Sequence, residues 1–140
     1  MEQIEVEFKK LLTSKGYSIT SSRFELFKLL LGKEPLTMAE ITSIASTFAN
    51  RATVYRNIEL FEKLGIVNRL QIGWKYKLEL SDRFHPHHHH ISCISCGKIE
   101  QLTPDNALEK YFMTQASKLG YKLSDHQLEL SGTCMTCTKT

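Results

Sequence analysis

In the first 65 residues, apolar side chains recur at every third or fourth position, which is the period of an amphipathic α-helix. Ile4, Phe8 and Leu11 show this spacing in the first segment. Residues that begin and end helices divide the region. Thr37 and Glu40 have the spacing of a capping box, and glycines follow the periodic segments. We therefore predict helices over residues 2–13, 21–31, 37–46 and 51–64.

After Gly65, the pattern changes to an alternation of apolar and charged residues. Residues 74–80 alternate from Trp74 to Leu80, which predicts a half-buried strand. Residues 67–71 are the expected partner strand, with a turn around Ile72 and Gly73. Three or four helices followed by a two-stranded hairpin is the plan of a winged helix. We therefore assign residues 1–80 to a winged-helix DNA-binding domain.

The second half of the chain has a mixed pattern. Extended segments are predicted at residues 87–92, 98–102 and 122–130, and a helix is predicted at residues 104–119 with Pro104 in its first turn. We expect residues 81–86 to form a hinge and residues 87–140 to form a small α/β dimerisation domain. The expected fold class is therefore α/β in the α+β sense, with two domains in one chain.

Charge and composition add a functional division. The net charge is +3, and the excess of Lys and Arg lies within residues 1–80, whereas all six His and all four Cys lie within residues 81–140. This distribution indicates one module that faces a polyanion and one that binds metal, although +3 also fits an ordinary surface charge. No apolar run is long enough to cross a membrane, and the acidic N-terminus has no signal-peptide core. We therefore expect a cytoplasmic protein without membrane association.

Two CxxC motifs contain all the cysteines, which are Cys93, Cys96, Cys134 and Cys137. Zinc prefers four tetrahedral ligands, and two CxxC turns supply four thiolates and leave no position for water. We therefore predict one structural Zn²⁺ site. The alternatives are two disulfides, which are rare in cytosolic proteins, or a redox motif, which needs only one CxxC beside a βαβ unit.

Four consecutive histidines, His87, His88, His89 and His90, precede the first CxxC motif, and His85 stands just before them. In an extended strand, successive side chains point to opposite faces. His87 and His89 would then share one face, and His88 and His90 would share the other, so that the run could serve two metal sites. The alternative is a solvated polar strand.

The start of the predicted helix at residues 51–64 carries polar side chains beside its apolar stripe. With Val54 and Ile58 buried, four residues face outward where a recognition helix meets base edges: Arg51, Thr53, Tyr55 and Arg56. Contacts with phosphates or the minor groove are expected from Lys15, Tyr17 and Arg23, and backbone contacts from Lys75 and Lys77. Alone, these residues also fit an ordinary solvated surface; the helix–helix–wing context favours DNA binding.

Taken together, four segments resemble the ferric uptake regulator (Fur) family over nearly the full length of the chain. They are residues 16–23 (GYSITSSR), 52–57 (ATVYRN), 64–67 (LGIV) and 87–98 (HHHHISCISCGK). The resemblance implies a metal-responsive transcriptional repressor that binds an inverted-repeat operator in double-stranded DNA as a homodimer. It also implies that a divalent metal at the hinge, Zn²⁺ or Fe²⁺ or a related ion, sets the spacing of the two winged helices.

The resemblance assigns the tighter hinge site to His87, His89, Glu109 and His126. The family commonly has Asp where His89 stands in this chain. Three imidazoles and one carboxylate favour zinc, nickel or cobalt over manganese, and they weaken the argument for iron.

A second, weaker hinge site is implied at Glu79, His88 and His90. The chain departs from the family at two positions, because Pro35 stands where a His is common and Gln101 stands where an acid is common. Solvent or His85 would then complete the coordination shell. These departures argue against a peroxide-sensing role, which the family performs at this site.

Two other functions fit parts of the sequence. A zinc hydrolase would need an open coordination position and a general base, and the chain has no HExxH or comparable motif. We therefore expect neither an enzyme nor a small organic substrate. The other alternative is a metal-independent DNA- or protein-binding module whose His run only buffers metal. Operator binding measured with and without a chelator distinguishes these functions from a metal-dependent repressor.

Overall fold

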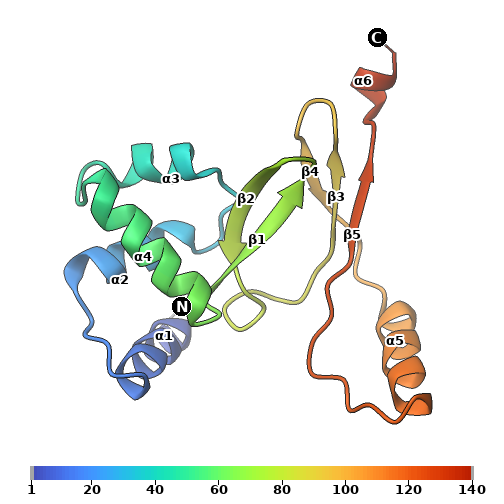
Figure 1. The fold of residues 1–140 in the computed structure, drawn as a ribbon, viewed down its shortest axis with the longest axis horizontal. Helices are drawn as coiled ribbons and strands as arrows, with labels where there is room; N and C mark the ends of the chain where they lie inside the picture. Colours follow the sequence, from blue (N-terminus) through green and yellow to red (C-terminus); the bar gives the residue numbers. More distant parts are fainter. Residues whose placement is uncertain (1, 140) are drawn as a thin grey trace. The chain divides into compact units, whose positions relative to one another are not determined.

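The computed structural model describes residues 2–139 and divides them into two compact units, with the division between Pro86 and His87 (Figure 1). The first unit contains α1 (Glu2–Ser14), α2 (Ser21–Leu30), α3 (Met38–Ala45), α4 (Arg51–Lys63), β1 (Val67–Ile72) and β2 (Lys75–Leu80). The second contains β3 (His90–Cys93), β4 (Ile99–Gln101), α5 (Asn106–Lys118), β5 (Glu129–Gly132) and α6 (Met135–Thr138). Within residues 2–139, no helix is both long and apolar enough to span a membrane.

Aromatic side chains form the centre of the first unit. The rings of Phe8 and Phe27 stack with their centroids 4.0 Å apart, and Phe61 meets Phe8 edge-on at 5.6 Å. All three side chains are fully buried, together with aliphatic side chains from all four helices. Full burial of a large apolar side chain contributes about 1.5–3 kcal/mol. This core therefore fixes how the helices lie and which face of α4 remains outside.

Side-chain caps determine where α3 and α4 begin. The predicted capping box is confirmed: Glu40 N donates to Thr37 Oγ1 at 3.1 Å, and Thr37 N donates to Glu40 Oε2 at 2.8 Å. At α4, Asn50 Oδ1 accepts from Thr53 N at 2.9 Å. An N-cap of this kind contributes about 1 kcal/mol. The polar first turn of α4 is therefore held in a defined helical conformation.

β1 and β2 form the predicted antiparallel hairpin, but its turn differs from the prediction. Ile72 pairs with Lys75, so the turn consists of Gly73 and Trp74. Gly73 has a φ of +59°, a left-handed conformation that glycine adopts without strain from a side chain. The prediction that Trp74 lies in a half-buried strand is wrong, because its side chain is 87% exposed. The inward-facing alternation begins only at Tyr76.

The segment predicted as a hinge, residues 81–86, packs against the first unit. Ser81 Oγ donates to Gly65 O at 2.7 Å, and Phe84 is buried in the aromatic core, with its ring centroid 5.2 Å from that of Phe27. These contacts attach residues 81–86 to the first unit. The division between the two units therefore lies at the end of this segment, after Pro86.

The second unit is built on a three-stranded sheet in the order β4-β3-β5, in which β3 is antiparallel to β4 and parallel to β5. Its strands are shorter than predicted. β3 begins at His90 rather than at residue 87, and β5 begins at Glu129, so His126 precedes this strand instead of lying on it. Because strand ends depend on pairing partners, the sequence pattern alone did not locate them.

α5 begins later than predicted and buries none of its residues. It starts at Asn106 because Asp105 Oδ1 accepts from the N–H groups of Ala107 and Leu108 and so acts as the N-cap. Among residues 87–139, Cys93 is the one buried hydrophobic side chain. The second unit therefore lacks a hydrophobic core of its own and needs another source of stability.

Candidate metal centres and nucleic-acid surface

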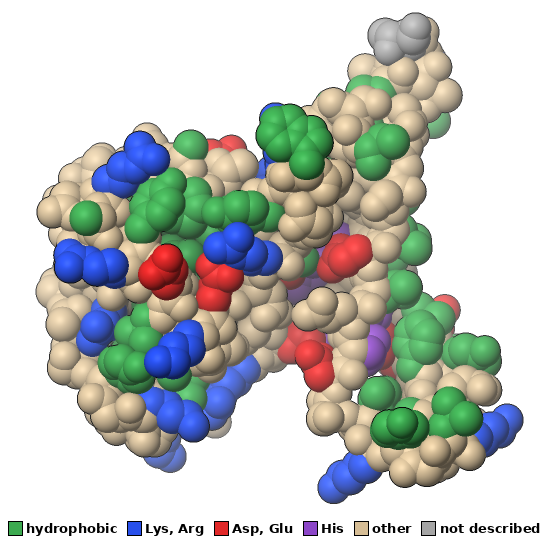
Figure 2. Space-filling view, viewed as in Figure 1, with side chains coloured by type: hydrophobic (Ala, Val, Ile, Leu, Met, Phe, Trp, Pro, Cys, Tyr) green, Lys and Arg blue, Asp and Glu red, His purple; other side chains and the backbone are tan. Residues whose placement is uncertain are grey.

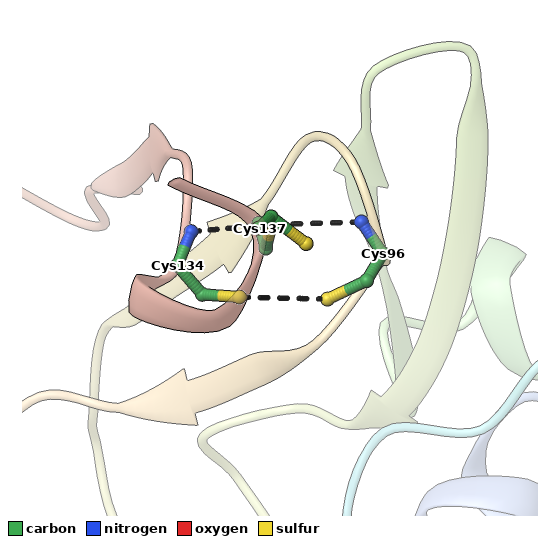
Figure 3. Close-up of side chains that lie close together, drawn as sticks. Cys96, Cys134 and Cys137 are labelled. Atoms are coloured by element: carbon green, nitrogen blue, oxygen red, sulfur yellow. Dashed lines mark hydrogen bonds between the residues drawn. The ribbon is translucent and has the colours of Figure 1, made fainter. Parts of the chain in front are cut away.

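The four cysteines of the second unit lie together, and the structure contains no disulfide between them. Cys93 and Cys96 flank the turn after β3, whereas Cys134 and Cys137 belong to the turn that forms α6. All four Sγ atoms lie within 4.8 Å of one another. Figure 3 shows the sulfurs of Cys96 and Cys134 pointing toward each other, at a distance of 3.8 Å.

This arrangement fits a structural zinc ion. At a Zn–S distance of about 2.3 Å, the sulfurs of a regular tetrahedron stand about 3.8 Å apart, which is the distance between Cys96 Sγ and Cys134 Sγ. The backbone N–H groups of Cys96 and Cys134 also donate to Cys93 Sγ, at 3.5 and 3.3 Å. Such hydrogen bonds stabilise a thiolate, the form of cysteine that binds metal.

The pKa values of two thiols in the cluster are shifted in opposite directions. Hydrogen bonds from the backbone of Cys134 and then of Cys96 lower the pKa of Cys93 to about 6. The pKa of Cys137 is raised to about 12, first by its hydrogen bond with Cys134 and then by burial. The four sulfurs therefore do not all ionise by themselves at neutral pH. A divalent cation supplies the charge that four adjacent thiolates require.

A second cluster in this unit joins the segment before β3 to α5 and to the segment before β5. It consists of His87, His89, Glu109 and His126, with candidate ligand atoms within 4.8 Å of one another. His89 Nε2 lies 2.6 Å from Glu109 Oε1, and His126 Nε2 lies 2.6 Å from Glu109 Oε2. His87 Nε2 is 3.0 Å from His126 Nε2. These are the four residues that the family resemblance assigns to one metal site.

The electrostatics of this cluster centre on Glu109. Burial raises the pKa of Glu109, but the hydrogen bond with His89 and the charges of His126 and His87 outweigh burial, so the pKa lies below its usual value. A carboxylate therefore meets three imidazoles, each through its Nε2 atom. Divalent transition metals bind such a set of nitrogen and oxygen donors, and the residues present fit a metal of this class.

The remaining two histidines of the run form a separate pair. The ring centroids of His88 and His90 are 4.5 Å apart. Glu79, the third ligand predicted with them, is on β2 in the first unit, so this ligand set spans two separate units and stays a prediction. A residue that the sequence analysis missed, Glu129, has Oε1 3.6 Å from His90 Nδ1. It is there because β5 pairs with β3 so that Glu129 stands opposite His90.

The predicted DNA-reading residues lie on the outer side of the first two turns of α4. Arg51, Tyr55 and Arg56 are exposed and Thr53 is partly exposed, whereas Val54 is buried in the core. The guanidinium of Arg51 stands over the Tyr55 ring, 5.2 Å from its centroid. Lys and Arg side chains are spread over the visible face of the first unit in Figure 2, interspersed with hydrophobic and acidic side chains.

Arg23 is held next to these residues by Asn57, which the sequence analysis did not single out. Arg23 Nε donates to Asn57 Oδ1 at 3.1 Å, and Arg23 Nη1 donates to Ser18 O at 2.8 Å. A polar hollow of about 340 Å³ lies between α2 and α4, lined by Thr20, Ser22, Arg23, Thr53, Arg56 and Asn57. Two guanidinium groups and three hydroxyls at its wall suit a phosphate oxygen.

The other predicted DNA contacts lie on other elements of the first unit. Lys15 is exposed after α1, and Tyr17 is half-buried, with the Arg23 guanidinium 5.8 Å from its ring centroid. On β2, Lys75 is exposed and Lys77 is half-buried. The structure thus places all of these residues in the first unit, and Tyr17 and Arg23 contact each other.

Comparisons with known proteins find relatives for a chain that combines candidate metal centres with a candidate DNA-binding surface. Residues 14–131 match the Ferric uptake regulator family. The chain is 32% identical to the Ferric uptake regulation protein of Campylobacter jejuni, over 93% of this chain and 85% of that protein. It is 30% identical to the Peroxide operon regulator of Bacillus subtilis, over 91% and 89%. The Helicobacter pylori ferric uptake regulator, described as having three functional metal-binding sites, superposes with a TM-score of 0.78 at 25% identity, over 99% and 94%.

Proposed function

Because the chain belongs to the ferric uptake regulator family, we propose that it is a metal-dependent transcriptional repressor that binds an operator in double-stranded DNA. The observation that carries the proposal is the convergence of His87, His89, Glu109 and His126 in the second unit. Its relatives are transcription regulators, which confirms the expectation that the chain is not an enzyme. Its place of action would be the cytoplasm, where its DNA target lies.

Two metal ions have separate roles in this proposal. Zn²⁺ at Cys93, Cys96, Cys134 and Cys137 would be structural, because four thiolates close the coordination shell. The regulatory metal would bind at His87, His89, Glu109 and His126, where three nitrogens favour Zn²⁺ or a related late metal over Fe²⁺. A weaker set, Glu79 with His88 and His90, would connect metal binding to the winged helix because Glu79 lies on β2.

The test is metal-dependent DNA binding. Metal-loaded protein is used to select binding sequences from random duplexes, and the selected operator is titrated in a gel shift with and without a chelator mild enough to leave the four-cysteine zinc in place. We expect the affinity to fall at least tenfold with chelator and to return when metal is added. Equal binding in both conditions would support a metal-independent module instead, and an absence of DNA binding would refute the proposal.

A homodimer is the form in which the second unit gains the hydrophobic burial that it lacks alone. Figure 2 shows hydrophobic side chains grouped over α5, and large apolar residues in this unit are exposed, among them Tyr111 at 58%, Leu119 at 75% and Tyr121 at 72%. Exposed apolar surface of this extent marks a protein interface. A two-fold symmetric dimer would also present two α4 helices to an inverted-repeat operator.

We expect the protein to sediment at twice its chain mass of 16.1 kDa. Tyr121→Asp and Leu130→Asp should each weaken the dimer more than tenfold, because a buried unpaired carboxylate is costly. Val6→Asp, at an exposed apolar position on α1, is the matched control and should leave the mass unchanged. A monomeric wild-type protein would exclude the dimer. Dimers in both second-unit variants would place the interface elsewhere.

Arg56→Ala and Tyr55→Ala should each reduce operator affinity without changing the metal content. The exposed side chains lie at the start of α4, where a base contact contributes about 1–3 kcal/mol and the loss falls unevenly across operator variants. A uniform loss with a lower salt dependence would assign that residue to phosphate. Gel shifts on a panel of operators measure both quantities, with Glu59→Ala, an exposed position further along α4, as the control. Unchanged binding in both variants would mean that α4 is not the reading helix.

A further inference from the structure

His90 is a buried histidine at the start of β3, and a carboxylate stands beside it on the neighbouring strand. The side chain of His90 is 5% exposed, and its Nδ1 atom is closed to solvent. In the parallel register of β3 with β5, His90 pairs with Glu129, so the two side chains lie on the same face of the sheet. Glu129 Oε1 is 3.6 Å from His90 Nδ1, although Glu129 belongs to none of the predicted ligand sets.

The two ring nitrogens of His90 are suited to different roles. Because Nδ1 is closed to solvent and faces Glu129, a metal ion that enters from solvent reaches this ring at Nε2. An imidazole that binds metal through Nε2 carries its proton on Nδ1, and this N–H group needs an acceptor. The Glu129 side chain is 39% exposed, so a small rotation brings its carboxylate from 3.6 Å to the hydrogen-bond distance of about 2.7–2.9 Å.

The other strand next to β3 offers a weaker acceptor. Gln101 on β4 pairs with His90 from that side, and its side chain is an uncharged amide. A carboxylate that accepts from the distal N–H group of an imidazole fixes the ring orientation and raises the basicity of the metal-binding nitrogen. β5, and not β4, therefore supplies the charged acceptor for His90.

We propose that Glu129 is a positioning residue for metal binding by His90. It accepts a hydrogen bond from His90 Nδ1–H and holds the imidazole in the tautomer whose unprotonated Nε2 binds the metal. The ring of His88, 4.5 Å away between centroids, supplies a second imidazole to the same ion. This inference rests on the weaker metal set of the proposed function, and it adds a residue that does not itself touch the metal.

The test compares Glu129→Gln with Glu100→Gln, which removes the same charge from the opposite face of the sheet, where Glu100 pairs with Ile91. Co²⁺ is titrated into full-length protein that keeps the four-cysteine zinc and whose tighter site is already filled with Zn²⁺, which Co²⁺ displaces poorly. Its visible absorption reports affinity and coordination number. We expect the Co²⁺ affinity of Glu129→Gln to fall about 10- to 100-fold, with an unchanged spectrum at saturation, and that of Glu100→Gln to match the wild type.

Nitrogen-15 NMR supplies a measurement that a purely structural role of Glu129 would not change. In wild-type protein saturated with Zn²⁺, we expect the proton of His90 to reside on Nδ1 and to resonate far downfield, as a hydrogen bond to a carboxylate requires. The signal is assigned by its absence in His90→Gln. In Glu129→Gln the resonance should move upfield, because an amide is a weaker acceptor, while the melting temperature should change no more than in Glu100→Gln.

The outcomes separate this inference from the proposed function. Equal Co²⁺ affinity in the two glutamine variants, or a proton on Nε2 of His90 in the Zn²⁺-saturated protein, would overturn the role of Glu129. A changed coordination number in Glu129→Gln would overturn it in favour of a direct ligand. If the wild type binds no Co²⁺ beyond the filled sites, the inference fails, and the gel shift still decides the repressor function. If operator binding is absent but Co²⁺ affinity depends on Glu129, the repressor function fails and the inference stands.

Discussion

Cys96→Ser is expected to remove the structural zinc and unfold the second unit while the first unit remains folded. Residues 87–139 bury one hydrophobic side chain, Cys93, and α5 buries none, so apolar burial does not hold this unit together. The free energy of zinc binding to four thiolates is coupled to folding and is comparable with the whole stability of a small domain, about 5–15 kcal/mol. Loss of one ligand therefore removes the main stabilising interaction.

Three measurements on Cys96→Ser check this expectation. Zinc content should fall by one ion per chain, the circular dichroism signal should lose the contribution of the second unit, and the protein should become monomeric. Ser95→Ala is the matched control, because Ser95 is the exposed neighbour within the same CxxC turn and carries no ligand. A zinc-free Cys96→Ser protein that remains dimeric and resists heat as the wild type does would contradict a structural role for the metal.

The helices of the first unit could be predicted because their signals are local. The capping box of Thr37 and Glu40 and the glycine after α4 each involve residues a few positions apart, and the core then selects the apolar face. Trp74 shows where this reasoning fails. It continues the apolar alternation of β2 by one step, but the register that pairs Ile72 with Lys75 moves it into the turn.

The candidate sites also consist of residues that local sequence motifs revealed and residues that only the tertiary structure brings into place. CxxC pairs and the His run are visible because ligand chemistry demands those residue types at short spacing. Asn57 and Glu129 were missed because their positions depend on tertiary structure. Asn57 reaches Arg23 across the α2–α4 packing, and Glu129 meets His90 only through the parallel register of β5 with β3. The sequence does contain one indication of the role of Asn57, which is a polar residue between the buried Val54 and Ile58 in an otherwise apolar stripe.

His126→Ala is expected to remove the regulatory metal and reduce metal-dependent operator affinity at least tenfold, while the four-cysteine zinc stays in place. The His126 Nε2 atom is within 3.0 Å of both His87 Nε2 and the Glu109 carboxylate, so its removal takes one of four converging donors from the site. His88→Ala should instead leave this metal bound and weaken the response to added metal. The predicted partners of His88 are His90 and Glu79. Together they form a site with fewer protein ligands than the corresponding site of the family.

The decisive comparison is metal content and operator affinity measured on both variants together, after mild chelation and again after metal titration. Gln127→Ala, an exposed neighbour of His126, is the control for a purely local disturbance and should resemble the wild type in both. Lower pH should weaken metal binding in all variants that retain the site, because imidazole binds metal only when neutral and protonates at a pKa of about 6.5 in free form. If His88→Ala loses the tight metal and His126→Ala keeps it, the roles of the two sites are interchanged. If neither variant changes metal content, the regulatory metal binds elsewhere in the chain.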